Sequence, residues 1–197
     1  MTVPLALDLA TLPVALAGSG PALLKRLALL DGESVPNLHI YAPEPDEAVT
    51  EAAGPRLIPR LPTEAEIARY RILFVAGLPR AGSEHLAALA RTHRVLVNVE
   101  DTLPLCDFHV PAILRRGELA ISISTGGGSP TLSRRLREYL TELFPEVWAE
   151  RIRRIAGMRE EMRREGASMG EVAERTNAVI DGERWLPGLK VVETDSN

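Results

Sequence analysis

Short, continuously apolar segments alternate with stretches of helical spacing along most of the chain. The apolar segments occupy residues 14–17, 38–41, 72–76, 95–99 and 119–123. Their length and the lack of regular polar alternation are typical of strands buried on both faces. Apolar residues at helical spacing, as between Leu23 and Leu30, predict connecting helices. The pattern therefore predicts an α/β fold with a parallel sheet covered by helices on both faces.

Capping signals mark the expected starts of four helices. A hydroxyl residue followed three positions later by glutamate forms a capping box, and this pattern occurs at 63–66 and 168–171. Ser83 is expected to cap a helix over residues 84–91. Ser129, with a proline directly after it, is expected to open a further helix.

The pattern changes after Pro130. One helical stripe carries Leu132, Leu136, Leu140 and Leu143. Apolar residues then recur every three to four positions over 148–162, flanked by arginines and glutamates, which predicts an amphipathic helix. This third of the chain is too small to enclose a hydrophobic core of its own, so its apolar residues are expected to pack against another surface. A second copy of the chain is the simplest such partner. We therefore expect a homodimer through helices in 131–165, and a partly extended tail from Leu186.

These changes divide the chain into three expected segments. They are an α/β domain over 1–112, a connecting segment over 113–146 and a helical C-terminal domain over 147–197.

The amino-acid composition of the chain excludes several classes of partner and site. The 197 residues carry a net charge of −4, which gives no electrostatic case for a nucleic-acid partner. The single cysteine, Cys106, excludes an internal disulfide framework and a multi-cysteine metal site. No apolar run approaches the roughly 20 residues needed to span a bilayer. The N-terminus lacks the basic start of a signal peptide. We expect a cytoplasmic protein that does not associate with membranes.

A glycine turn follows the first predicted strand. Gly18-Ser-Gly20 lies between that strand and a helix, where backbone can approach a pyrophosphate at the helix N-terminus. The full dinucleotide fingerprint has a small third residue where this chain has Leu23, and no acidic residue ends the second strand at Tyr41. The turn alone therefore leaves two interpretations open, dinucleotide binding and a plain tight turn.

Asp101 follows the predicted strand 95–99. A carboxylate at a strand end can serve as a general base. Taken alone, Asp101 is better interpreted as a cap or a solvated loop carboxylate, since these are far commoner. Glu100 beside it is expected to point away from the Asp101 side, because side chains alternate along a strand.

A hydroxyl- and glycine-rich loop spans residues 124–130. Its backbone N–H groups suit a carboxylate or phosphate, although helix capping by Ser129 explains part of the pattern. A local basic cluster in this acidic chain is either a solvated helix face or a site for a polycarboxylate: Arg115, Arg116, Arg134, Arg135 and Arg137. His109 and Cys106 are better interpreted as structural, and no metal-ligand spacing is present.

Together these motifs resemble the precorrin-2 dehydrogenase/sirohydrochlorin ferrochelatase family, which also forms the N-terminal module of siroheme synthases. The matching segments, in order, are PLALDL, VALAGSGPALLKRLALL, ILFVAG, VNVED, LCDFHVPAIL, ISISTGGGSP and LSRRLREYLTELFP. The resemblance covers nearly the whole chain. Its most specific parts are NVED, CDF with PAI, and STGGGSP in this order and spacing.

The resemblance implies NAD-dependent oxidation of precorrin-2 to sirohydrochlorin in siroheme biosynthesis, and in bifunctional members insertion of ferrous iron as a further substrate. It implies that residues 1–112 form a NAD-binding domain with a Rossmann-like parallel sheet and that residues 113–146 form a dimerisation segment. It places the general base on Asp101. It places NAD binding on Gly18, Ser19, Gly20, Pro21, Ala22, Ala76 and Gly77. The expected tetrapyrrole-binding residues are Asn98, Ser124, Thr125, Gly126, Gly127, Ser129, Arg115, Arg116 and Arg134.

The chain departs from the family pattern at three places. Leu23 replaces a small residue in the NAD turn, the run 76–80 replaces an Ala-Thr-Asp-Asp-like sequence, and Thr125 replaces a serine. These departures keep two alternatives open. One is a non-catalytic module that binds a tetrapyrrole or senses NAD. The other is a Rossmann dehydrogenase for an unrelated small molecule, which would leave the STGGGSP loop and the arginine cluster without a role.

Overall fold

The structure is a computed structural model in which residues 3–186 are described. The chain forms two compact units that divide between Val110 and Pro111. The expected boundary after residue 112 lies close to this division, and the expected boundary after residue 146 falls between two helices of the second unit.

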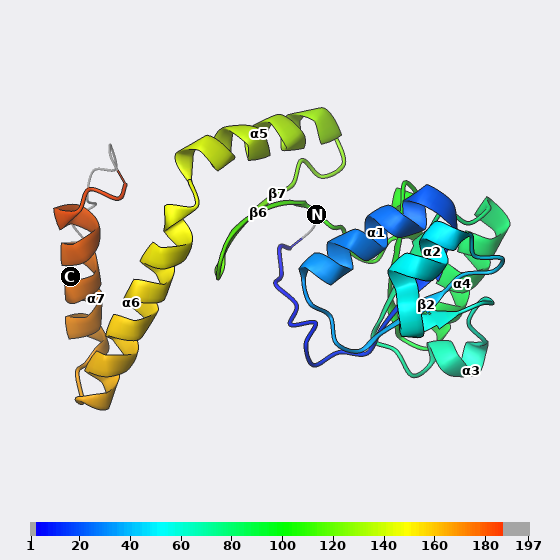
Figure 1. Cartoon of the computed structure of the whole chain (residues 1–197), viewed down its shortest axis with the longest axis horizontal. Helices are drawn as coiled ribbons and strands as arrows, with labels where there is room; N and C mark the ends of the chain where they lie inside the picture. Colours follow the sequence, from blue (N-terminus) through cyan, green and yellow to red (C-terminus); the bar gives the residue numbers. More distant parts are fainter. Residues whose placement is uncertain (1–2, 187–197) are drawn as a thin grey trace. The chain divides into compact units, whose positions relative to one another are not determined.

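A five-stranded parallel sheet forms the centre of the first unit (Figure 1). Its strands run in the order β3-β2-β1-β4-β5, and every neighbouring pair is parallel. The strands are β1 (Val14–Gly18), β2 (Leu38–Tyr41), β3 (Leu57–Ile58), β4 (Ile72–Ala76) and β5 (Leu96–Val99). The predicted α/β fold with a Rossmann-like parallel sheet is thus confirmed.

Helices cover both faces of this sheet. The connecting elements are α1 (Gly20–Gly32), α2 (Glu47–Ala53), η1 (Gly54–Arg56), α3 (Glu64–Ile67), α4 (Arg80–Thr92) and η2 (Leu103–Leu105). Residues of α1 and α2 pack into one core with alternate strand residues, and residues of α3 and α4 pack into the other. All five residues of β1 and of β4 are buried, which explains their continuously apolar sequences.

The start of α4 differs from the sequence-based prediction. The helix begins at Arg80 with Pro79 as its N-cap residue, whereas residues 84–91 with a Ser83 cap were predicted. Ser83 lies inside the helix, is buried, and donates from its hydroxyl to the Leu78 carbonyl at 3.5 Å. Pro79 supplies an extended residue directly before the helix, so a hydroxyl cap four residues later is not needed.

The expectation that strand 119–123 belongs to the parallel sheet was wrong. In the second unit β7 (Leu119–Ile123) pairs antiparallel with β6 (Ala112–Arg116) in a separate two-stranded sheet. The residues of β7 alternate between half-buried and exposed positions, which is the pattern of a strand with one solvated face. β6 was not recognised as a strand from the sequence.

Three helices follow the hairpin: α5 (Pro130–Leu143), α6 (Val147–Arg164) and α7 (Met169–Gly182). The capping boxes at 63–66 and 168–171 are both formed, and the Ser129 hydroxyl accepts from the Leu132 N–H at 3.2 Å. α7 ends at Gly182, with Glu183 as its C-cap residue. The predicted extended tail lies, after Leu186, outside the described residues.

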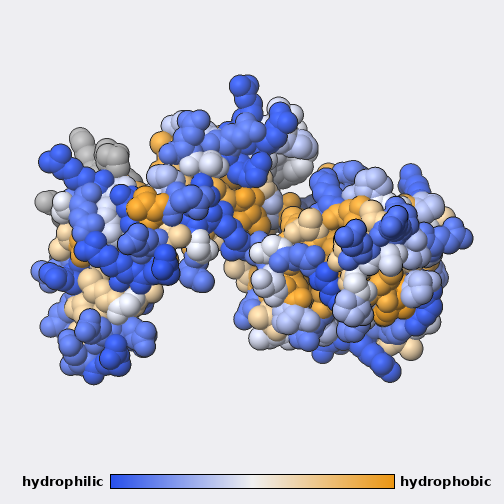
Figure 2. Space-filling model, viewed as in Figure 1, coloured by the Kyte–Doolittle hydropathy of each residue, from blue (hydrophilic) through white to orange (hydrophobic). Residues whose placement is uncertain are grey.

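Aromatic packing ties the end of α7 to α6. Trp148 is buried and contacts Phe144 and Trp185, with ring centroids 5.1 and 6.2 Å apart. The Arg151 guanidinium lies over both indole rings, 5.0 Å from Trp148 and 5.1 Å from Trp185. α5 has no buried residue, and exposed apolar side chains are visible beside its polar surface (Figure 2). No helix within residues 3–186 is both long and apolar enough to cross a membrane.

Candidate active site

Two glycine turns pack against each other at the carboxyl edge of the parallel sheet. The Ser19 N–H donates to the Ala76 carbonyl at 3.0 Å, and the Ser19 hydroxyl donates to the Gly77 carbonyl at 2.6 Å. A Cβ atom on Gly18 would overlap the Ala76 carbonyl oxygen, and one on Gly77 would overlap the Ser19 carbonyl oxygen. Both glycines are therefore required for the turn after β1 to contact the turn after β4.

The N-terminus of α1 opens directly from these turns. The Ser19 hydroxyl is used by Gly77, so the helix has no side-chain cap, and its first-turn N–H groups lack partners within the helix. Gly20 has a φ of 58°, and a Cβ atom built on it meets nothing within 4 Å. A phosphate group fits this place, because the helix end has free N–H groups and a partial positive charge and because there is open space at Gly20.

The seven residues predicted to bind NAD are all brought together around this cradle, which consists of residues 18–22 with Ala76 and Gly77. The departure at Leu23 does not obstruct it, because the Leu23 side chain is fully buried in the core between α1 and the sheet. The small residue that lies close to Gly77 is instead Ala22, one position before Leu23. The Ala22 Cβ lies 3.2 Å from a Cβ atom built on Gly77.

The end of β5 carries three polar residues. Asn98 is buried, and its Nδ2 donates to the Phe108 carbonyl at 2.9 Å. Asp101 is exposed and has a φ of 58°, a left-handed conformation that aspartate tolerates better than most residues. A cavity of about 570 Å³ lies at this edge of the sheet, and both Gly77 and Asp101 line it. Of the predicted site residues, Gly77 and Asp101 therefore line one cavity within the first unit, whereas residues 18–22 do not line it.

A charged cluster beside Asn98 was not predicted. The Glu100 side chain is only 10% exposed, and its Oε1 accepts from the Lys25 Nζ at 3.0 Å. The Arg26 guanidinium lies over the Phe74 ring, 5.3 Å from its centroid. Burial lowers the pKa of Arg26, while the negative charges of Glu100 and Asp101 act in the opposite direction. The basic pair on α1 is visible in the sequence, but its carboxylate partner lies 75 positions away.

Cys106 has a structural environment, as predicted. Its thiol donates to the Val99 carbonyl at 3.1 Å, and Sγ accepts from the Val99 N–H at 3.3 Å. Burial raises the pKa of Cys106, which disfavours the thiolate needed for nucleophilic chemistry.

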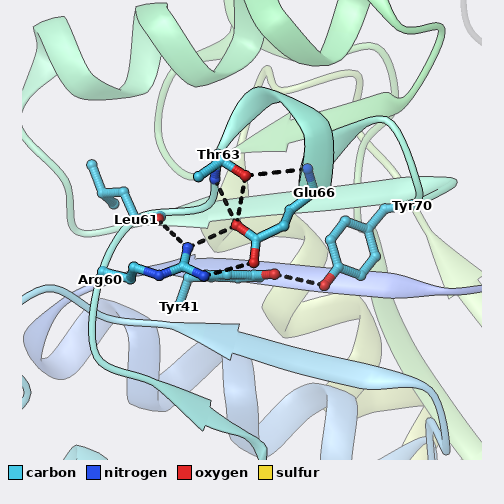
Figure 3. A network of polar contacts seen from close by, with 6 residues as sticks. All are labelled: Tyr41, Arg60, Leu61, Thr63, Glu66 and Tyr70. Carbon is cyan, nitrogen blue, oxygen red and sulfur yellow. Dashed lines mark hydrogen bonds and ion pairs between the residues drawn. The ribbon is translucent and has the colours of Figure 1, made fainter.

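A second polar network fixes the end of β2 (Figure 3). The two terminal guanidinium nitrogens of Arg60, Nη1 and Nη2, donate to the Glu66 carboxylate at 2.7 Å, and the Thr63 backbone N–H and hydroxyl also donate to it at 2.8 Å. The Tyr41 and Tyr70 hydroxyls lie 2.8 Å apart. Burial raises the pKa of both tyrosines, so both stay neutral. The network therefore ties β2, the segment after β3, and α3 together.

The loop at 124–130 belongs to the second unit and is held by its own hydroxyls. The Thr125 Oγ1 accepts from the Ser129 N–H at 3.1 Å and lies 3.2 Å from the Ser133 hydroxyl. Gly126 and Gly127 have φ values of 61° and 84°, which L side chains rarely adopt. The capping interpretation of Ser129 is confirmed, and tetrapyrrole binding by this loop stays a prediction.

The predicted arginines differ in their surroundings. Arg116 is buried, and its Nε donates to the Phe144 carbonyl at 2.6 Å while Nη1 lies 3.2 Å from Glu146. Arg115 is exposed, and Arg134 is 65% exposed and 3.8 Å from Glu138. No group of three or more histidine, cysteine, aspartate or glutamate side chains suited to a metal occurs in the described part of the chain.

The parallel sheet and the glycine cradle define a Rossmann-like dinucleotide-binding protein. Residues 5–112 match the family model described as "Putative NAD(P)-binding", and residues 116–143 match that of the "Sirohaem biosynthesis protein central" region. The first match covers more than half of the chain, and the chain belongs to this NAD(P)-binding family.

Curated relatives agree with these matches. The siroheme synthase of Methylococcus capsulatus is 34% identical over 167 residues, which cover 82% of this chain and 34% of the relative. That of Pseudoalteromonas translucida is 30% identical over 148 residues, covering 73% of this chain and 31% of the relative. The chain thus spans about a third of the length of these relatives. The resemblance to the N-terminal module of siroheme synthases is confirmed.

A solved structure shares the fold. The protein named "SirC, precorrin-2 dehydrogenase" has a TM-score of 0.75 with this chain at 22% identity, over 94% of this chain and 93% of its own. At that identity the match supports the fold.

Proposed function

We propose that this protein catalyses the NAD-dependent oxidation of precorrin-2 to sirohydrochlorin in siroheme biosynthesis. The observation that carries the proposal is the shared cavity, which is lined both by Gly77 of the glycine cradle and by Asp101. Such a cavity can hold a nicotinamide and a carboxylate base against one substrate. The names of the curated siroheme synthases and of the structural neighbour support the choice of substrate.

The residues of the first unit have separate roles in this proposal. The free N–H groups at the start of α1 and the open space at Gly20 would hold the cofactor's pyrophosphate. Bound NAD would supply the hydride acceptor for a hydride that leaves a carbon of the macrocycle. Asp101 takes the accompanying proton as general base. The Oδ1 of Asn98 is buried and has no hydrogen-bonding partner among residues 3–186, and it would accept a hydrogen bond from the substrate.

The second unit would hold the substrate's carboxylate arms. Arg115 and Arg134 supply positive charge and planar donors, and Ser124 supplies a hydroxyl. Arg116 contributes chiefly charge, since its guanidinium already binds the Phe144 carbonyl. Thr125, Gly126, Gly127 and Ser129 shape the loop that presents these groups.

Insertion of ferrous iron is a second proposed activity of the same site. Metal entry displaces protons from the ring nitrogens, and Asp101 is placed to accept them. Iron is a substrate in this proposal and needs no resident site made of three protein ligands.

We further propose that the protein is a cytoplasmic homodimer. Its lone half-buried cysteine suits a reducing compartment. The apolar stripe of α5, which consists of Leu132, Leu136, Tyr139 and Leu143, is 38–59% exposed. A second copy of the chain would cover it.

Replacement of Asp101 by Asn tests the proposed reaction. We expect Asp101→Asn to lower anaerobic precorrin-2 turnover by at least about a hundredfold, as loss of a general base does, with NAD affinity within about twofold of wild type. Glu51→Gln, on the exposed face of α2, is the control and should retain full activity. Unchanged turnover in Asp101→Asn would contradict the assigned role. Retained tetrapyrrole binding without any NAD binding in the wild type would favour a non-catalytic module.

A further inference from the structure

Three charged side chains meet where α1 passes the end of β5. Lys25 and Arg26 are consecutive on α1, and Glu100 follows β5 directly. Lys25 binds Glu100 Oε1 at 3.0 Å, so one of the two cations is paired with the only carboxylate of this cluster. The cluster keeps one positive charge, on Arg26, that is not neutralised by contact.

Arg26 holds its guanidinium in an unusual position. The group lies 5.3 Å from the centroid of the Phe74 ring, and no hydrogen bond or ion pair joins it to another described residue. Phe108 packs edge-on against the same Phe74 ring at 5.5 Å. A half-buried guanidinium has five N–H donors in a planar fork, and here these donors lack protein acceptors.

Two buried acceptors of the first unit also lack hydrogen-bonding partners among the described residues. They are Asn98 Oδ1 and Glu100 Oε2. Asn98 lies opposite Phe74 in the register of β4 and β5, and Glu100 follows two residues later, on the same side as Asn98 by strand alternation. Buried polar atoms without partners are rare in native proteins and point to a ligand or water that completes them. Unpaired donors and unpaired acceptors therefore lie together on the α1 side of the sheet.

We propose that Arg26 determines substrate specificity by binding a carboxylate of the tetrapyrrole, and that Glu100, held by Lys25, is a second binding residue that accepts a hydrogen bond from the same ligand. The proposal rests on the proposed function, which supplies a ligand with several carboxylates and with N–H groups. The planar fork of arginine matches a carboxylate in bidentate geometry. A phosphate of the cofactor is the other source of an anion, but the cradle at Gly20 already provides for it on the same helix.

Direct titrations with sirohydrochlorin and, separately, with NAD test the role of Arg26. We expect Arg26→Met to weaken sirohydrochlorin binding about ten- to a hundredfold, the usual effect of losing a charged hydrogen-bonded partner, and to leave NAD affinity within about twofold. Arg26→Lys keeps the charge without the fork and should give an intermediate loss; it also serves if Arg26→Met does not fold. Arg69→Met removes an exposed arginine of the same unit and should change neither affinity.

The role of Glu100 is tested by steady-state kinetics. We expect Glu100→Gln to raise the KM for precorrin-2 several-fold with kcat within about twofold, and Glu100→Asp to restore part of the loss. Glu51→Gln again controls for the loss of one exposed carboxylate. If Glu100 had only a structural role, Glu100→Gln would instead lower the amount of folded protein, and it would not raise KM while leaving kcat nearly unchanged.

Two results would overturn the inference. Loss of NAD affinity in Arg26→Met, with sirohydrochlorin affinity unchanged, would assign Arg26 to a cofactor phosphate. Unchanged affinities for both ligands would remove Arg26 from the site. In both cases wild-type protein still binds sirohydrochlorin, so the proposed function would stand. Failure of the wild type itself to bind sirohydrochlorin would overturn the proposed function together with the inference.

Discussion

Gly77 shows how much of the site depends on single residues. Its φ of 73° is in the left-handed region, and a Cβ atom there would overlap the Ser19 carbonyl oxygen. The sequence predicts a glycine turn after β1, because Gly18 and Gly20 directly follow an apolar run. It does not predict that Gly77 meets that turn, since the contact joins residues 58 positions apart. Arg26 and Glu100 were missed for the same reason.

At Gly77 we expect substitution by alanine to destabilise the protein by more than about 2 kcal/mol, because the left-handed conformation alone costs a residue with Cβ about 1–2 kcal/mol and the overlap with Ser19 adds to it. NAD affinity should fall as well, since the two turns would separate. Gly32→Ala, where a Cβ atom meets nothing within 4 Å, is the control. Denaturant unfolding and NAD titration measure both effects, and equal stability of the two variants would contradict the packing described.

Secondary structure elements were predictable to the extent that their signals were local. The strands of the parallel sheet are continuously apolar, and the boxes at 63–66 and 168–171 carry their own hydrogen-bonding partners. The hairpin of β6 and β7 was harder to predict from the sequence, because β6 contains two arginines. Arg116 on this strand is nevertheless buried, through bonds to Phe144 that no local pattern could show.

The Arg60–Glu66 ion pair, which involves α3, is expected to make the stability of the protein depend on pH. The Arg60 guanidinium, with the Thr63 backbone and hydroxyl, holds the pKa of Glu66 well below its usual range. The resulting stabilisation is present above about pH 4.3, the usual pKa of glutamate, and is lost as the pH falls below it. We expect Glu66→Gln to lower the free energy of unfolding at pH 7 by at most about 1 kcal/mol, the upper end of the range for solvent-screened pairs.

Urea unfolding at several pH values checks this prediction. The difference between wild type and Glu66→Gln should shrink as the pH falls below about 4.3. Glu51→Gln, which removes an exposed glutamate from α2, should show no such change. A difference that stays constant down to pH 3 would show that the ion pair does not contribute as described.

On the scale of the whole molecule, two units of different character make up one chain. The first encloses two apolar cores around its sheet, whereas the second leaves the apolar stripe of α5 exposed. The predicted NAD-binding residues and Asp101 lie in the first unit, and the predicted carboxylate-binding arginines lie in the second. This distribution fits a protein in which one unit performs the redox chemistry and the other contributes substrate contacts and assembly.

The proposed dimer is tested through α5. We expect Leu136→Glu to shift the mass measured by light scattering at micromolar concentration from dimer towards monomer, because the substitution places a charge in the apolar stripe. Arg135→Glu introduces the same side chain at the neighbouring exposed position and should leave the dimer intact. A wild-type protein that is monomeric at this concentration would contradict the assembly.

The central claim is that the glycine cradle and Asp101 carry out one oxidation together. The most direct test follows NADH and sirohydrochlorin simultaneously in an anaerobic reaction of the wild-type protein with enzymatically generated precorrin-2 and NAD. The account predicts equal amounts of both products and no sirohydrochlorin when NAD is omitted. Sirohydrochlorin formed without NADH, or no product from folded protein that binds both ligands, would contradict it.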